Sequence, residues 1–162
     1  RDVAGLEAAR SGMKGSERCH TVSADLSTEA GVKATVDAYP FDSCDILVNN
    51  AGINIRSKAE DFTDEQFGTV FSTNFFSVYR MSKAMLPRLK KGQSPAVVNI
   101  SSVAGQTHIP SGCAYGAAKA AMDQLTRNMS VEWARFGIRV NAVAPGPVWT
   151  PLVRGANATY LE

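Results

Sequence analysis

One stretch of the sequence, Val97 to Lys119, carries three side chains that together could perform acid/base chemistry. Ser102 follows an apolar run, 96–100, that is typical of a buried strand. Tyr115 and Lys119 stand in a later run of small residues that we expect to be helical, where residues four apart lie on one face. A phenol, an ammonium and a hydroxyl beside the end of a strand are suited to reducing a carbonyl or oxidising an alcohol.

Each of these groups has a definite task in such a reaction. A tyrosine phenol keeps its proton at pH 7, because its reference pKa is about 10. A neighbouring ammonium favours the phenolate, so Lys119 would let Tyr115 act as an acid in one direction and as a base in the other. The hydroxyl of Ser102 would hold the substrate oxygen while negative charge develops on it.

The spacing of tyrosine and lysine does not identify this chemistry by itself. Tyr79 and Lys83 are also four apart, but the residue thirteen before Tyr79 is Gln66, inside an expected helix. The residue thirteen before Tyr115 is Ser102, directly after a strand and next to a second serine that we expect only to pack or to bond to backbone. We therefore interpret Tyr115 as catalytic and Tyr79 as an ordinary side chain of an amphipathic helix.

The strands and helices that must position these groups alternate along the chain. Apolar runs predict strands over 19–24, 45–48, 96–100 and 138–143. Helical spacing predicts helices over 1–13, 27–39, 64–91 and 112–136. Thr63 and Gln66 form a capping box before the third helix, and Gly137 ends the fourth. This alternation predicts an α/β fold with a doubly wound, Rossmann-like parallel sheet, which binds ligands at the carboxyl ends of its strands.

Composition narrows the class of protein. The chain has 162 residues, 44% of them hydrophobic, and a net charge of +2, which predicts one globular domain without a nucleic-acid or membrane partner. No apolar run approaches the roughly 18 residues that a membrane span needs. The three cysteines have no metal-ligand or redox spacing, which favours a reducing compartment and no metal site. We expect a cytoplasmic protein, with an organellar transit peptide upstream of residue 1 as the alternative.

The motifs resemble those of the short-chain dehydrogenase/reductase family. They are the set Ser102, Tyr115 and Lys119, the turn Asn49-Asn50-Ala51-Gly52 after one strand, and Pro145-Gly146 after another. The run 115–127 is similar to the tropinone-reductase-like branch, and the resemblance covers nearly the whole chain. It implies an NAD(P)-binding Rossmann-type domain that moves hydride between a nicotinamide cofactor and a small carbonyl or alcohol substrate.

The resemblance also implies roles for further residues. Asn74 would belong to the catalytic set, by kinking its helix around a water that links Lys119 to solvent; the alternative is an exposed polar residue. The implied cofactor residues are Asp25 and Leu26 on the adenine side, Asn49, Ala51 and Gly52 along the adenine ribose, Tyr115 and Lys119 at the nicotinamide ribose, and Pro145, Gly146, Val148 and Thr150 at the carboxamide. A turn that needs Asn and Gly for its conformation would also explain 49–52, and the two interpretations are compatible.

Arg1 bears on the choice of cofactor. It matches an arginine that NADP-preferring members carry just past their second strand. A guanidinium binds a 2′-phosphate through paired, charge-assisted hydrogen bonds. The alternative is a solvated terminal arginine. We expect NADP(H) rather than NAD(H).

The glycine-rich phosphate turn of the family has no counterpart in this sequence. Gly12 and Gly15 are not preceded by a strand. The family carries that turn, a helix and a second strand upstream of the position matched by Arg1, and a lid and a last strand beyond the Pro-Gly loop. We therefore expect residues 1–162 to be one domain, incomplete at both ends, of a protein of about 250 residues. By itself this piece should be inactive, poorly folded and unable to bind NADPH.

Three functions remain open. The leading one is an NADP(H)-dependent oxidoreductase that acts on a ketone/secondary-alcohol pair. The second is reduction of a 3-oxoacyl thioester on a carrier protein, which a basic patch near the site would favour. The third is a truncated, non-catalytic paralogue that acts by pairing with full-length subunits, against which the intact Asn-Ser-Tyr-Lys set argues.

We also expect a homodimer or homotetramer through helices 64–91 and 112–136. The second of these helices carries more apolar surface than we expect one sheet face to cover, in a stripe made of Ala118, Met122, Leu125, Met129 and Trp133. An uncovered apolar stripe marks an interface.

Overall fold

The computed structural model describes residues 2–110 and 112–148, and its centre is a parallel sheet. The strands are β1 (Ile46–Asn49), β2 (Ala96–Ile100) and β3 (Arg139–Val143), in the order β1-β2-β3. Val97 of β2 pairs with Leu47 on one side and with Val140 on the other. Parallel strands connected through helices confirm the α/β fold with a parallel sheet.

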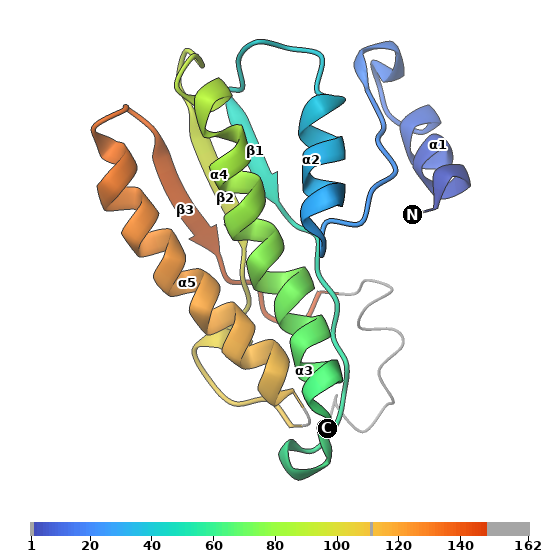
Figure 1. The fold of residues 1–162 in the computed structure, drawn as a ribbon, viewed down its shortest axis with the longest axis vertical. Coiled ribbons are helices and arrows are strands. Elements are labelled where there is room, and N and C mark those ends of the chain that lie inside the picture. Colours follow the sequence, from blue (N-terminus) through green and yellow to red (C-terminus); the bar gives the residue numbers. More distant parts are fainter. Residues whose placement is uncertain (1, 111, 149–162) are drawn as a thin grey trace.

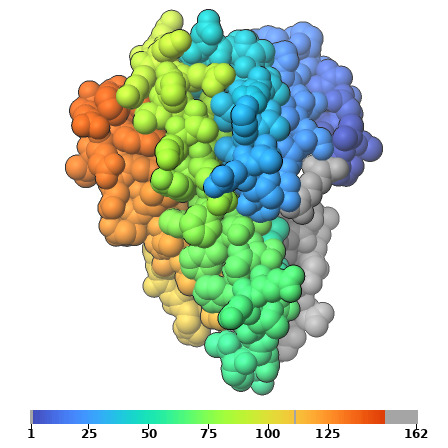
Figure 2. Space-filling view, in the orientation of Figure 1, coloured from blue at the N-terminus to red at the C-terminus, as the bar shows by residue number. Residues whose placement is uncertain are grey.

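Helices α2, α4 and α5 lie side by side on one face of this sheet (Figure 1). Their side chains cover that face in the space-filling view (Figure 2). The helices are α1 (Val3–Ser11), α2 (Glu29–Asp37), α3 (Asp64–Phe71), α4 (Ser77–Leu89) and α5 (Cys113–Ala134), with 3-10 turns at Ser16–Arg18, Ala59–Asp61 and Val103–Gly105. In the described part of the chain no helix combines the length and the apolar character needed to cross a bilayer.

The local signals for helix ends are confirmed. Thr63 and Gln66 exchange both bonds of a capping box at the start of α3. Gly137 has a φ of 72°, in the left-handed region that favours glycine, and it ends the connection from α5 into β3. The helix predicted over 64–91 is interrupted, however, because a π-helical turn, Ser72–Phe76, separates α3 from α4.

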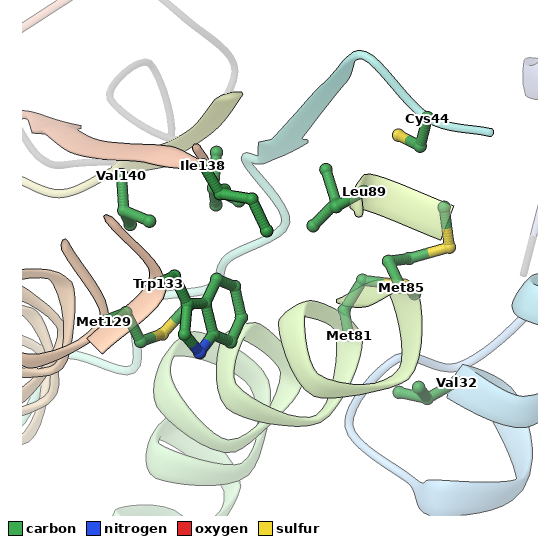
Figure 3. Close-up of a cluster of buried hydrophobic side chains, with 10 residues drawn as sticks. Val32, Cys44, Met81, Met85, Leu89, Met129, Trp133, Ile138 and Val140 are labelled. Carbon is green, nitrogen blue, oxygen red and sulfur yellow. The ribbon is translucent and has the colours of Figure 1, made fainter. Parts of the chain in front are cut away.

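The hydrophobic core lies between the sheet and the three helices (Figure 3). Met81, Met85 and Leu89 approach it from α4, and Met129 and Trp133 from α5. Val97 and Val140 meet them from the sheet, because alternate side chains of a strand point to the same face. In β1, the side chains of Ile46 and Val48 point to the opposite face of the sheet and are exposed.

Residues 19–24 do not form the predicted strand. A strand is stabilised by backbone hydrogen bonds to a neighbour, and β1 pairs only with β2 among the described residues. The segment runs instead beside α1, where the Thr21 hydroxyl donates to Glu7 Oε1 at 2.7 Å. Residues 19–24 therefore have no strand structure, because no neighbouring strand among the described residues pairs with them.

The prediction that the apolar stripe of α5 is left uncovered is wrong. Ala118, Met122, Met129 and Trp133 are buried, and Leu125 packs against the core. The stripe is therefore the face that α5 turns toward the sheet, and it is no evidence for an interface. Self-association stays a prediction without this support.

Substitution on the two sides of α5 tests this placement. Met122 is 0% exposed, so Met122→Ala should lower the free energy of unfolding by about 2–5 kcal/mol through a cavity in the core. Val131, on the same helix, is 78% exposed, and Val131→Ala should change it by less than about 0.5 kcal/mol. Urea denaturation of both variants is the measurement, and equal losses would contradict the assignment.

Candidate active site

The end of β2 and the beginning of α5 are held close together. After Ile100 the chain passes through Ser101 and Ser102 into the 3-10 turn Val103–Gly105, which packs against α5. A Cβ at Gly105 would lie 2.9 Å from the backbone nitrogen of Ala120, well inside normal contact. Glycine is therefore required here, because only hydrogen lets the turn approach the helix at the level of the candidate catalytic residues.

Tyr115 and Lys119 lie on one face of α5, as predicted. The Lys119 ammonium donates to the carbonyl oxygen of Ile100 at 2.6 Å and lies 5.5 Å from the centroid of the Tyr115 ring. Lys119 is only 4% exposed. Burial lowers its pKa to about 8, while the negative charge of Asp123 acts in the opposite direction. The side chain is thus a mostly protonated, desolvated cation at the end of the central strand near pH 7.

The two serines after β2 differ in the way the sequence predicted. Ser101 is buried, and its hydroxyl donates to the carbonyl oxygen of Lys119 at 3.5 Å. Ser102 is half-buried, and its Oγ accepts from the backbone N–H of Ala104 at 3.2 Å. Because Ser102 uses its oxygen as an acceptor in this bond, its hydrogen is available for a substrate oxygen.

Asn74 lies inside the π-helical turn, a common position for a helix kink. The interpretation as an exposed polar residue is wrong, since Asn74 is fully buried. Its Oδ1 accepts from the Ile53 N–H at 2.9 Å, and its Nδ2 donates to the Ile53 carbonyl at 2.8 Å. A Cβ at Gly52 would stand 2.7 Å from that Oδ1, so glycine is needed for the amide to reach Ile53. The link through a water to Lys119 stays a prediction.

Asn49 belongs to a buried hydrogen-bond network that the sequence analysis missed. Its Nδ2 donates to Ser82 Oγ at 3.0 Å and to Asn99 Oδ1 at 2.8 Å. Asn99 Nδ2 donates to Thr126 Oγ1 at 2.8 Å, which in turn donates to the Met122 carbonyl at 2.8 Å. The available signal was Asn99 itself, an amide inside an otherwise apolar strand. Because both amide hydrogens of Asn49 are used inside the protein, any contact of its side chain with a cofactor would have to come from its oxygen.

Leu26, Asn49 and Ala51, three of the residues assigned to the adenine side, line one cavity, whereas Asp25 and Gly52 do not. The cavity has a volume of about 260 Å³ and lies along the outer edge of β1. Leu26, before α2, and Asn50 and Ala51, after β1, share its wall although they are far apart in sequence. Asp25 Oδ1 accepts from the backbone N–H and the hydroxyl of Ser27 at 3.1 and 2.7 Å, which shapes the turn into α2.

The residues assigned to the nicotinamide side follow β3. The Pro145 carbonyl accepts from the Val103 N–H at 3.1 Å, so this loop is held beside Ser102. Gly146 and Val148 continue it and are exposed. Thr150 and Arg1 lie outside the described residues.

Known proteins resemble this chain in sequence and in fold. The family model described as short chain dehydrogenase matches residues 1–161. A tropinone reductase homolog of Arabidopsis thaliana is 44% identical over 108 residues, 67% of this chain and 41% of that protein. The chain spans about half the length of the curated relatives that it matches.

Two solved structures share most of this fold. The Pseudomonas aeruginosa RhlG/NADP active-site complex has a TM-score of 0.89 and 32% identity, covering 95% of this chain and 63% of that one. The 3-ketoacyl-(acyl-carrier-protein) reductase of Brucella melitensis, complexed with NADH, has a TM-score of 0.87 and 34% identity, covering 95% and 66%.

The buried network should be essential for stability. Asn99→Ala would take one buried hydrogen-bond partner from Asn49 and one from Thr126, so we expect a loss of at least about 1–3 kcal/mol in the free energy of unfolding. Asn128→Ala is the control, because Asn128 is an exposed residue of α5 that only accepts from Gln124 at 2.9 Å. Chemical denaturation measures both, and an Asn99→Ala variant as stable as this control would show that the network contributes little.

Proposed function

Because this chain belongs to the short-chain dehydrogenase family, we propose that the protein containing it transfers hydride between NADP(H) and a ketone/secondary-alcohol pair. The observation that carries the proposal is the position of the Lys119 ammonium. It lies 2.6 Å from the Ile100 carbonyl and 5.5 Å from the Tyr115 ring centroid, at the strand end that Ser102 follows. An acid, a cation and a hydroxyl therefore meet at one edge of the sheet.

In carbonyl reduction each side chain acts on the substrate oxygen or on its proton. Tyr115 would donate its hydroxyl proton to that oxygen, and Ser102 would donate a hydrogen bond to it. Lys119 would stabilise the phenolate left behind, and its charge acts strongly because the surroundings exclude water. Alcohol oxidation reverses these proton movements. The nicotinamide, when bound, supplies or accepts the hydride.

The described residues fit a dinucleotide that lies across the carboxyl ends of the strands. Leu26, Asn50 and Ala51 line one cavity beside β1, so the segments proposed for the adenine side lie close together. The loop at Pro145 and Gly146, held against the turn after Ser102, suits the nicotinamide side. This extended position is the one in which open α/β sheets bind nucleotides.

A 3-oxoacyl thioester on a carrier protein is the second candidate, favoured by the likeness to the Brucella reductase. Ser57 forms a β-bridge with Gly112 at the start of α5. Its neighbours in sequence, Arg56 and Lys58, therefore lie at the rim of the site. Glu60 and Asp61 follow directly, so positive and negative charges on this rim are equal in number. The basic patch that would favour a carrier protein is therefore lacking at this part of the described rim, and we favour a small ketone.

Removal of the Tyr115 hydroxyl tests the proposed acid. In the complete protein that contains this chain, Tyr115→Phe should lower the rate of NADPH-dependent ketone reduction by at least about 10², because general acid catalysis is lost. Steady-state turnover on a ketone panel is the measurement. The control is Tyr79→Phe, at an exposed tyrosine whose ring lies 5.8 Å from Lys83 Nζ, and it should leave turnover unchanged. Near-normal turnover of Tyr115→Phe would remove the basis of the proposed mechanism.

The preference for NADP(H) rests on Arg1. Arg1→Ala should weaken NADPH binding by roughly 1.5–3 kcal/mol, the scale of hydrogen bonds to charged groups, and leave NADH binding nearly unchanged. Calorimetric titration with both cofactors measures this, with Arg18→Ala, at an exposed side chain, as the control. Equal losses for the two cofactors would mean that Arg1 does not contact the 2′-phosphate.

A further inference from the structure

A second buried charge, Asp123, lies on α5 behind the proposed active site. It stands four residues after Lys119, so the two side chains lie on the same face of the helix one turn apart. Asp123 is 8% exposed, and its Oδ1 has no hydrogen-bond partner in the described part of the protein. A buried carboxylate oxygen without a donor is costly, so its presence calls for a compensating charge.

Lys119 is the cation that can provide this compensation. The elements packed against α5 are β3, the turn Val103–Gly105, α3 and the π-helical turn. In their described residues the ionisable side chains are Arg139, whose Nη2 donates to the Ser94 carbonyl at 3.3 Å, and two exposed carboxylates in the first turn of α3, Asp64 and Glu65. The two turns and β2 contribute no ionisable side chain.

The remaining ionisable side chains of α5 do not compete for this role. They are Cys113, Tyr115, Arg127 and Glu132. Cys113, Arg127 and Glu132 are exposed, and Arg127 donates to Gln124 at 3.2 Å. Within the described residues, the negative charge of Asp123 opposes the effect of burial on the pKa of Lys119.

The two charges act on each other without forming an ion pair. Lys119 donates to the Ile100 carbonyl, and no ion pair within 4.0 Å joins it to Asp123 among the described residues. The attraction therefore acts through the protein interior, where a charge has a longer reach than in water. A direct ion pair would draw the ammonium away from Tyr115, whereas a carboxylate one turn away does not occupy its hydrogens.

We propose that Asp123 is a positioning residue of this site, which keeps the buried Lys119 side chain in its ammonium form at the end of β2. The proposal rests on the proposed function only for the claim that this ammonium serves Tyr115. With a neutral residue at position 123, the Ile100 carbonyl would be left to stabilise the charge of the desolvated Lys119 ammonium. Burial would then favour the neutral amine, which offers no positive charge to a phenolate.

The test is Asp123→Asn, which removes the charge and keeps the shape, in the protein that contains this chain. Titration of Lys119 would be followed by NMR of its Cε and Nζ resonances, assigned with Lys119→Arg. The midpoint near 8 should fall by about 1 unit, the scale for a nearby opposite charge. The basic limb of the pH–rate profile for ketone reduction should move to lower pH with it.

Two further variants separate the effect of charge from that of general disturbance. Glu132→Gln makes the same change in net charge on the same helix, at an exposed position, and should leave the midpoint of Lys119 unchanged. Asp123→Glu keeps a carboxylate and should return the midpoint toward that of the unaltered protein.

The outcomes distinguish this proposal from the proposed function. A Lys119 midpoint that is equal in the unaltered protein and in Asp123→Asn would overturn the proposal, whatever the activity of the variant. If Asp123→Asn fails to fold, the same comparison is made with Asp123→Ser, and an equal Lys119 midpoint there would also overturn the proposal. A midpoint that falls while the pH–rate profile stays in place would support the action of Asp123 on Lys119 and overturn the catalytic role of Lys119.

Discussion

The buried amide pair of Asn49 and Asn99 is the interaction on which the rest of the site depends. The two residues are paired partners in the register of β1 and β2, and their side chains bond at 2.8 Å. Each amide would cost several kcal/mol in an apolar interior without a partner. A shift of one residue would turn one amide to the other face of the sheet, so the pair helps to set the register. With this register, the residues after both strands reach the same edge.

Helix α5 is attached to this register through one further bond. Thr126 accepts from Asn99, and this contact fixes the helix along its axis against the central strand. Lys119 lies two turns earlier on the same helix, and its ammonium therefore meets the last carbonyl of β2. Gly105 allows the close approach that this geometry requires. On the other side of the site, the paired bonds between Asn74 and Ile53 hold the chain that leaves β1.

Burial has two opposing effects on the chemistry of this site. It strengthens the action of the Lys119 charge on its neighbours, because less water screens that charge. It also favours the neutral amine, and the pKa of Lys119 is lowered to about 8 for this reason. The carbonyl of Ile100 and the carboxylate of Asp123 act against the loss of charge. Such a site depends on groups behind the catalytic residues as well as on the residues that touch substrate.

The features predicted correctly from the amino-acid sequence are those that depend on neighbours along the chain. Apolar runs located β1, β2 and β3, the Thr63 capping box located the start of α3, and helical spacing placed Tyr115 and Lys119 on one face. The tertiary structure decided the features that depend on distant partners. In the part of the chain that the structure describes, residues 19–24 have no strand to pair with. Met122 faces the core, and the amide of Asn49 points inward. Local spacing sets a period, but only long-range packing determines which side of an element is buried.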